Sequence, residues 1–305
     1  AHAAVATGAD LIMPGPDLSG PAIAKLIVDE KVTVAAGVPT IWMAVLPELK
    51  GKDTSSLRSI PCGGSAVPKV LSEAYREQTG LPILQAWGMT ETSPIAAVCR
   101  LDADQELLAQ AEQAELRTQV GRIVFGAECR VVEPGTTELV PWNGESSGEL
   151  QCRGNWIAAD YYDDPRSRES FTDDGWLKTG DVATVDERGF VRLVDRTKDL
   201  IKSGGEWISS VELENELMAH PKIAEAAVIG VAHERWGEAP LACVVKAPDG
   251  ADLTEDEVLA FLEGKIAKWQ MPKGVVWIDE VPKTSVGKFS KKTLRDEYAG
   301  TLMPG

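Results

Sequence analysis

Residues 195–209 read Asp195-Arg196-Thr197-Lys198-Asp199-Leu200-Ile201-Lys202-Ser203-Gly204-Gly205-Glu206-Trp207-Ile208-Ser209. The chain before this stretch has a β-rich pattern, and the chain after it has a compact mixture of helical and strand patterns. A change of pattern across a polar, glycine-bearing segment is typical of a domain junction. A solvated linker is the simpler interpretation, but such a linker would not need the apolar pairs that flank the two glycines. We therefore predict a hinge at residues 196–202.

Residues 1–195, upstream of the hinge, are predicted to belong to one large domain. Within it, residues 1–118 alternate short apolar runs with helical patterns, which is typical of an α/β layer. A buried strand is predicted at 31–36, and further strands are predicted at 59–62 and 82–86. Helices are predicted at 39–49, from about residue 68, and, as a solvated acidic helix, at 102–117.

Residues 119–195 form a β-rich portion of the same domain. Turn signals stand at 133–135 and 186–189, and the second of these separates two apolar runs, 182–185 and 190–194. Two such runs across a short glycine-bearing turn predict a β-hairpin.

Residues 203–305 are predicted to fold as a small α+β domain. Ser209 and Thr254 each begin a helix as a capping box, with Glu212 and Glu257 three residues later. Strands are predicted at 226–231 and 241–246. The fold class expected for the whole chain is therefore α/β and α+β.

The composition is that of a globular protein with a strongly acidic surface. The 305 residues are 44% hydrophobic and 26% charged, with a formal net charge of −16. Such a surface argues against binding to nucleic acid or to anionic membranes. No apolar run approaches the roughly 20 residues that span a bilayer. The 5 cysteines are scattered and never form a C-x-x-C pair, which suits reduced thiols. We expect a cytoplasmic protein.

The first motif that carries chemistry is Gly63-Gly64-Ser65-Ala66-Val67-Pro68. Paired glycines let a backbone approach a flat ligand closely, although a strand-to-helix turn is the commoner explanation. The segment also nearly fits the G-x-S-x-G nucleophile elbow of hydrolases. Val67 replaces the last glycine, and none of His2, His220 and His233 is placed as the base of that fold requires, so we set a hydrolase aside.

Two further segments offer polar groups for a nucleotide. One provides an aromatic face, a hydroxyl group and a hard oxygen ligand for Mg²⁺; it reads Gln85-Ala86-Trp87-Gly88-Met89-Thr90-Glu91-Thr92. The other, Thr179-Gly180-Asp181, puts an acid on a tight turn, where it can accept from both ribose hydroxyls. Core packing, a helix cap and a plain turn are sufficient explanations of these segments taken singly.

The last motif lies near the C-terminus and reads Pro282-Lys283-Thr284-Ser285-Val286-Gly287-Lys288. It is superficially similar to a Walker loop, but the upstream glycine is absent and Phe289 stands where Ser or Thr is needed. A lysine on a turn suits brief engagement with a charged group, and a plain surface lysine is the commoner explanation.

Together, in this order and spacing, these segments resemble the conserved blocks of the adenylate-forming superfamily: acyl-CoA synthetases, luciferases and peptide-synthetase adenylation domains. Residues 204–210 and 267–272 are most similar to medium- and long-chain fatty-acid CoA ligases. The resemblance covers essentially the whole chain. It implies the C-terminal part of the large domain followed by a small mobile domain. It also implies that ATP activates a fatty or other carboxylic acid as its acyl-adenylate, which then passes the acyl group to coenzyme A.

The resemblance assigns nucleotide or cofactor contacts to residues from all these segments. They are Gly63, Gly64, Ser65, Ala66, Trp87, Gly88, Thr90, Asp181, Arg196, Gly204, Gly205 and Glu206. Trp87 is expected to stack on the adenine, although the family more often has Tyr there. Asp181 is expected to accept from the ribose hydroxyls with assistance from Arg196.

The catalytic residues that the resemblance implies are Lys288, Lys202, Thr90 and Glu91. Thr90 is expected to bind the α-phosphate, and Glu91 is expected to hold Mg²⁺. Lys288 matches the family lysine that bridges carboxylate and phosphate during adenylation.

The resemblance also implies a domain rotation between the two half-reactions, with the pivot at Lys198. In the second pose the 202–206 region faces the active site, and Gly204 and Gly205 line the pantetheine tunnel. Trp42 resembles an aromatic residue that gates the acyl tunnel in long-chain members. A buried core tryptophan is the open alternative for Trp42.

The largest departure of the sequence from the family is an absence. Family members carry an upstream Ser/Thr/Gly-rich loop whose lysine holds the β- and γ-phosphates, and this sequence contains no such run. We therefore expect a partial chain that is inactive alone. A non-catalytic nucleotide-binding remnant and an adenylation domain of another branch stay open. The implied partners are the acid, ATP and coenzyme A, with a homodimer as in long-chain relatives.

Overall fold

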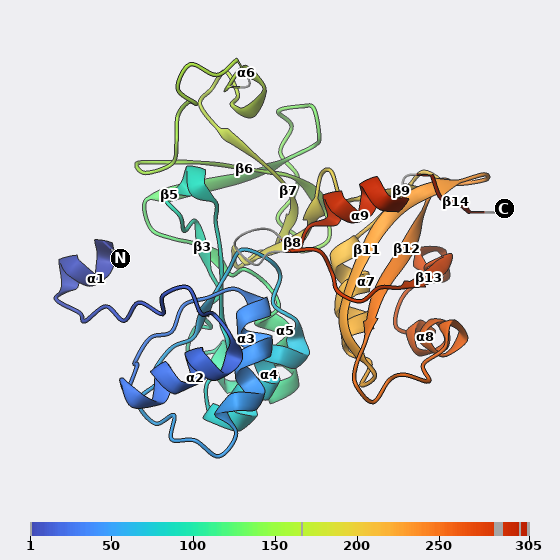
Figure 1. Cartoon of the computed structure of the whole chain (residues 1–305). Coiled ribbons are helices and arrows are strands. Elements are labelled where there is room, and N and C mark those ends of the chain that lie inside the picture. Colours follow the sequence, from blue (N-terminus) through green and yellow to red (C-terminus); the bar gives the residue numbers. More distant parts are fainter. Residues whose placement is uncertain (1, 166, 284–288, 299, 304–305) are drawn as a thin grey trace.

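The computed structural model describes residues 2–165, 167–283, 289–298 and 300–303. In these ranges the strands form two four-stranded sheets and then a six-stranded sheet. Figure 1 shows helices packed around the first and the last sheet. The mixed α/β and α+β class that the sequence predicts is confirmed.

The first sheet has the order β1 (Pro61–Cys62), β2 (Leu84–Trp87), β3 (Ala97–Val98) and β4 (Arg122–Ile123). Only β1 and β2 run parallel. The helical segments of this part are α1 (His2–Thr7), α2 (Gly20–Asp29), α3 (Pro39–Val45), η1 (Leu46–Leu49), α4 (Lys69–Thr79), η2 (Thr90–Thr92), η3 (Gln105–Leu107) and α5 (Gln110–Leu116). Side chains of α2, α3 and α4 form one buried cluster with Cys62 of β1 and with Ile60 and Ile83, which directly precede β1 and β2. This cluster holds β1 and β2 side by side, so the turns that follow them start close together.

The second sheet is an antiparallel meander of β5 (Ala127–Val132), β6 (Ser147–Gly154), β7 (Leu177–Val185) and β8 (Val191–Arg196). The short helix α6 (Ser167–Ser170) lies in the connection between β6 and β7. The core cluster of the second sheet includes Trp87 from the first sheet together with Leu150, Ala183 and Val191. Trp87 is therefore the side chain by which the end of β2 packs into the second sheet.

The third sheet has the order β10, β9, β12, β11, β14, with β13 also paired to β12. The strands are β9 (Ile201–Ser203), β10 (Glu206–Ile208), β11 (Ile223–His233), β12 (Gly237–Lys246), β13 (Gly274–Trp277) and β14 (Leu302–Met303). The helical segments are α7 (Ser210–Met218), α8 (Glu255–Leu262), η4 (Lys268–Gln270) and α9 (Lys291–Tyr298). We call this part, from β9 to β14, the C-terminal body.

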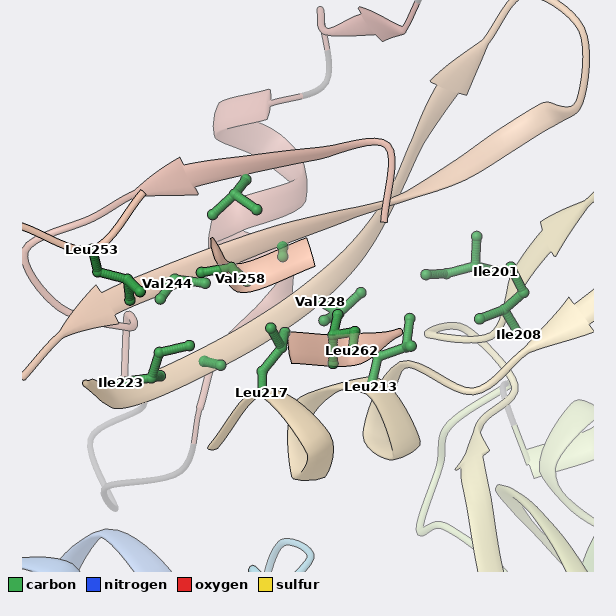
Figure 2. Close-up of a cluster of buried hydrophobic side chains, with 13 residues drawn as sticks. Ile201, Ile208, Leu213, Leu217, Ile223, Val228, Val244, Leu253, Val258 and Leu262 are labelled. Atoms are coloured by element: carbon green, nitrogen blue, oxygen red, sulfur yellow. The ribbon is translucent and has the colours of Figure 1, made fainter. Parts of the chain in front are cut away.

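The long strand β11 is buried on both faces. Ala226 and Val228 pack in a cluster with residues of α7 and α8, and Figure 2 shows Val228 together with Leu213 and Leu217 of α7. Ala227 and Ile229 instead pack with Leu294 of α9. Successive strand residues point to opposite faces, so α7 and α8 cover one face of the sheet and α9 covers the other. The C-terminal body therefore has a hydrophobic core of its own on each face.

Several predicted elements are confirmed. The expected hairpin forms between β7 and β8. Thr254 begins α8 with a complete capping box with Glu257, and the Ser209 hydroxyl accepts from the Glu212 amide at the start of α7. The strands expected at 226–231 and 241–246 lie inside the longer β11 and β12.

Two predicted elements are wrong in detail. Residues 31–36 were expected to form a buried strand, but Val34 makes only an isolated bridge to Ser59 and is 50% exposed. Hydrogen bonds on one side alone leave this segment at an edge. Residues 102–117 divide into η3 and α5 because Leu108 is extended, with φ −66° and ψ 162°.

No helix in the part of the chain that the structure describes is long and apolar enough to cross a membrane. The predicted hinge at 196–202 overlaps the end of β8 and the start of β9. The domain division at this point stays a prediction.

Candidate functional site

The glycine turn after β1 is held against β2. The Val67 amide donates to Gln85 Oε1 over 3.0 Å, and Gln85 is buried. A Cβ on Gly63 would lie 2.8 Å from the Ala86 carbonyl oxygen, closer than real Cβ contacts occur. Gly63 is therefore required by close packing of two backbones. This confirms a tight turn, and a ligand contact at 63–66 stays a prediction.

Trp87, Asp181 and Arg196 lie in direct contact. The indole Nε1 of Trp87 donates to Asp181 Oδ2 over 2.8 Å, and Arg196 Nε lies 2.8 Å from Asp181 Oδ1. Asp181 and Arg196 are register partners on β7 and β8. Residues predicted from three separate segments thus meet around one carboxylate.

The electrostatics of this cluster centre on Asp181, which is 4% exposed. Burial raises the pKa of Asp181, while Arg196, the Trp87 N–H and Lys198 act to lower it. A buried carboxylate with these partners is a strong hydrogen-bond acceptor. Each of its oxygens has lone pairs beyond the one that Trp87 or Arg196 uses. The group can therefore accept further donors such as hydroxyls.

The indole of Trp87 is mostly covered by protein. Only 7% of the residue is exposed, and it belongs to the core of the second sheet. Core packing, the alternative weighed from the sequence, thus describes most of its surface. Its bond to Asp181 fixes the plane of the ring. Stacking on an adenine stays a prediction.

Thr90 and Glu91 lie on the 3-10 turn η2 that follows β2 and Gly88. Thr90 is exposed, whereas Glu91 is half-buried. Glu91 Oε1 accepts from the Tyr161 hydroxyl over 2.6 Å, and the Glu91 carbonyl accepts from the Ala158 amide over 2.7 Å. No sequence motif predicts a role for Tyr161, because it lies in the connection between β6 and α6.

A divalent metal fits this turn only if substrate supplies most of its ligands. Within the described ranges, no group of three His, Cys, Asp or Glu side chains is placed to hold a metal ion. Mg²⁺ commonly binds through one or two carboxylates plus substrate phosphates and water. The single carboxylate of Glu91 beside an exposed Thr90 is compatible with that mode.

Residues 202–206 of the predicted junction lie on the hairpin formed by β9 and β10. The Lys202 ammonium lies 5.4 Å from the centre of the Trp207 ring, and the Lys202 amide donates to Glu238 Oε2 over 3.0 Å. Gly204 has φ +61°, and a Cβ there would lie 2.9 Å from the ring of Trp236. The positive φ and this close contact both require glycine. Gly205 and Glu206 complete the exposed tip of the hairpin.

The structure does not bring the hairpin residues onto the Asp181 cluster. Among described residues, no hydrogen bond, ion pair or ring contact joins Lys202 or 204–206 to Trp87, Asp181 or Arg196. Lys198 does lie near enough to lower the pKa of Asp181. Lys288, the predicted adenylation lysine, lies outside the described residues.

Trp42 lies in the core of the first part of the chain. It is 2% exposed, its carbonyl accepts from the Tyr75 hydroxyl over 2.9 Å, and the two rings meet edge to face at 6.0 Å. Its indole Nε1 is buried and has no hydrogen-bond partner among the described residues. This geometry is that of the core tryptophan weighed as the alternative, and the acyl gate stays a prediction.

No sequence motif predicts the buried charge network of Lys291, Glu214, Ser210 and Asp195, which we call the Lys291 network. Lys291 Nζ lies 2.7 Å from Glu214 Oε1 and donates to Ser210 Oγ over 2.6 Å. Ser210 donates from its amide and its hydroxyl to Asp195 Oδ2. Nearby, Arg295 forms an ion pair with Asp199. The network joins the end of β8 to α7 and α9, across the predicted hinge.

Comparison with known proteins identifies the family. Residues 1–162 match the family described as AMP-binding enzyme, and residues 212–288 match AMP-binding enzyme C-terminal domain. The first match covers more than half of the chain. The chain therefore belongs to the AMP-binding enzyme family, within the adenylate-forming superfamily.

Several similar curated proteins carry the names of CoA ligases. The chain is 45% identical over 298 residues to 3-methylmercaptopropionyl-CoA ligase of Ruegeria lacuscaerulensis, covering 97% of this chain and 54% of the relative. It is 42% identical over 301 residues to long-chain-fatty-acid–CoA ligase of Thermus thermophilus, covering 97% and 55%. The chain thus spans about half the length of the curated relatives it matches.

Solved structures agree with this assignment. ATP-bound MatB from Rhodopseudomonas palustris superposes with a TM-score of 0.81 at 32% identity, covering 94% of this chain and 54% of that one. The anthranilate CoA ligase AuaEII in complex with anthranoyl-AMP gives a TM-score of 0.84 at 28% identity, covering 95% and 55%.

Proposed function

We propose that the protein activates a fatty or other carboxylic acid with ATP as an acyl-adenylate and transfers the acyl group to coenzyme A. The observation that carries the proposal is the contact of Trp87, Asp181 and Arg196 around one buried carboxylate. Family membership and the CoA-ligase names of the relatives support the reaction class.

The chemical problem is that a carboxylate repels nucleophiles and has no leaving group. Attack of the carboxylate on the α-phosphorus of ATP, with loss of pyrophosphate, creates a mixed anhydride whose leaving group is AMP. The thiol of coenzyme A then displaces AMP. Both steps need the nucleotide held in one place while the second reactant is exchanged.

In this proposal the Asp181 carboxylate accepts from the ribose hydroxyls, and Arg196 keeps that carboxylate ionised. Trp87 is fixed by its bond to Asp181, and its ring is proposed to stack on the adenine beside residues 63–66. Charge-assisted hydrogen bonds to hydroxyls are about twice as strong as neutral ones. Ribose recognition is therefore assigned mainly to Asp181.

The Thr90 hydroxyl is proposed to donate to the α-phosphate, and Glu91 is proposed to be the protein ligand of Mg²⁺. Mg²⁺, when bound, supplies positive charge that screens the phosphates from the incoming carboxylate. Lys288 is proposed to stand between carboxylate and phosphate. At an effective dielectric near 20, a cation about 4 Å away contributes about 4 kcal/mol of Coulomb energy, roughly a thousandfold in rate if confined to the transition state.

The C-terminal body is proposed to rotate about Lys198 between the two half-reactions. Its packed core on both faces of β11 supports movement as a rigid unit. In the second pose the hairpin with Lys202, Gly204 and Gly205 faces the site and Lys288 leaves it. Trp42 is proposed as a gate of the acyl tunnel. We also propose that the protein is located in the cytoplasm and forms a homodimer.

The test is a pyrophosphate-release screen of the full-length protein against short, medium, long and aromatic acids. Release with fatty acids, followed by thioester formation on addition of coenzyme A, supports the proposal. Calorimetry with AMP and with an acyl-adenylate analogue separates the alternatives. Binding of AMP without release for any acid would favour the nucleotide-binding remnant. Adenylation without thioester formation would favour another branch of the superfamily.

A further inference from the structure

The hydroxyl of Tyr161 is bonded to the side chain of Glu91 from a distant part of the chain. The Oη to Oε1 distance is 2.6 Å across a separation of 70 residues. A tyrosine hydroxyl donates in this bond, because an ionised carboxylate can only accept. The bond engages one carboxylate oxygen and thereby fixes the direction in which the other oxygen, Oε2, points.

Tyr161 is held in place by contacts that do not involve Glu91. Its amide donates to Ser167 Oγ over 2.8 Å, and the Ser167 hydroxyl returns a bond to the Tyr161 carbonyl over 3.1 Å. Its ring meets Phe171 edge to face at 5.7 Å between ring centres. The position of the Tyr161 hydroxyl therefore does not depend on its bond to Glu91 alone.

The segment around Tyr161 is also fastened to the η2 turn by its backbone. Ala158 donates its amide to the Glu91 carbonyl over 2.7 Å, and the Ser93 hydroxyl donates to the Trp156 carbonyl over 2.9 Å. The η2 turn has only three residues, too few for a rigid helix. The hydrogen bonds with residues 156–161 thus hold this turn in place.

We propose that Tyr161 is a positioning residue that orients Glu91 for the divalent cation that accompanies ATP. This inference rests on the proposed function, in which Glu91 is the protein ligand of that cation. A carboxylate held by a hydrogen bond at one oxygen loses less freedom when its other oxygen binds the metal. Partners that orient metal ligands in this way typically change metal affinity 10- to 100-fold.

The experiment measures Mn²⁺ binding to the full-length protein in the presence of α,β-methylene-ATP, which cannot release pyrophosphate. Free Mn²⁺ is followed by electron paramagnetic resonance. For Tyr161→Phe, which keeps the ring contact with Phe171, the Mn²⁺ dissociation constant should rise about tenfold. Glu91→Gln should raise it at least as much. The matched control is Tyr162→Phe, because Tyr162 is fully exposed next to Tyr161, and it should bind Mn²⁺ like the wild type.

The outcomes distinguish the positioning role of Tyr161 from the metal-binding role of Glu91. If Glu91→Gln weakens Mn²⁺ binding and Tyr161→Phe leaves it unchanged or tightens it, the positioning role is wrong and the metal role of Glu91 stands. If Glu91→Gln leaves binding unchanged, the metal role itself is wrong. Should Tyr161→Phe fail to fold, Phe171→Leu, which frees the ring but keeps the hydroxyl, replaces it. An unchanged dissociation constant in that variant overturns the positioning role.

Discussion

Replacing Lys291 by Met should destabilise the C-terminal body far more than an ordinary surface substitution. The Lys291 ammonium lies 2.7 Å from Glu214 and 2.6 Å from the Ser210 hydroxyl, and the two charged side chains are only 12% and 10% exposed. Burial alone would lower the pKa of Lys291, but Glu214 and Asp195 raise it above its ordinary value. Methionine keeps an unbranched side chain of nearly the same length, and it removes the charge together with the donor that bonds Ser210.

The magnitude follows from what the substitution leaves behind. Glu214 would keep its bond from the Val228 amide, 2.7 Å long, but its carboxylate would be buried without a cation. Removing one partner of a buried ion pair typically costs about 3–5 kcal/mol. Burial already raises the pKa of Glu214, so part of this cost is relieved when Glu214 takes up a proton. We therefore expect about 3 kcal/mol at neutral pH.

The assay is native-state hydrogen exchange of β11 and β12 amides followed by mass spectrometry, which reads the opening free energy of this body alone. Lys292→Met is the matched control, because Lys292 is adjacent and exposed, and it should change that free energy by less than about 0.5 kcal/mol. The double variant Lys291→Met/Glu214→Gln should be more stable than the sum of the single effects predicts. A loss below about 1 kcal/mol for Lys291→Met, or strict additivity in the double variant, would refute the reasoning.

The remaining predictions concern the two half-reactions and the loss of folding stability at low pH. Lys288→Ala should abolish adenylate formation yet spare thioester formation from preformed acyl-adenylate; equal loss of both steps would contradict this. Lys198→Pro should preserve adenylation and stop transfer to coenzyme A, because proline fixes φ at the pivot; unchanged overall turnover would sink the hinge. Hydrogen bonds from Arg130 lower the pKa of Asp174 from 3.8 to about 2, so this ionised pair stabilises the fold above pH 3.8 and the contribution is lost as the pH falls to about 2. In Asp174→Asn, the free energy of unfolding, measured by circular dichroism, should depend less steeply on pH between about 2 and 3.8 than in the wild type. An unaltered pH dependence would contradict this prediction.

Local patterns predicted the elements whose causes are local. The hairpin of β7 and β8 depends on two apolar runs and a glycine turn, and the start of α8 depends on Thr254 and Glu257. The segment at 31–36 shows the limit of this reasoning. Its apolar residues suit a buried strand, but burial depends on a neighbour on each side, which no local pattern reports.

The candidate site was predictable where a motif marks it. Trp87, Asp181 and Arg196 were named from separate motifs, and the structure brings them together. The bond between the indole and the carboxylate was not predictable, because it depends on how two sheets pack. Tyr161 and Lys291 lie outside every motif, and their roles arise from contacts between residues far apart in the chain.

The most direct measurement is calorimetric titration of the full-length protein with AMP, comparing wild type with Asp181→Asn. Loss of the charged acceptor should weaken binding about tenfold or more, since hydrogen bonds to a charged group contribute about 1.5–3 kcal/mol. Glu187→Gln, on the exposed turn between β7 and β8, should bind AMP as the wild type does. An unchanged dissociation constant in folded Asp181→Asn would mean that AMP does not bind at the carboxylate shared by Trp87 and Arg196.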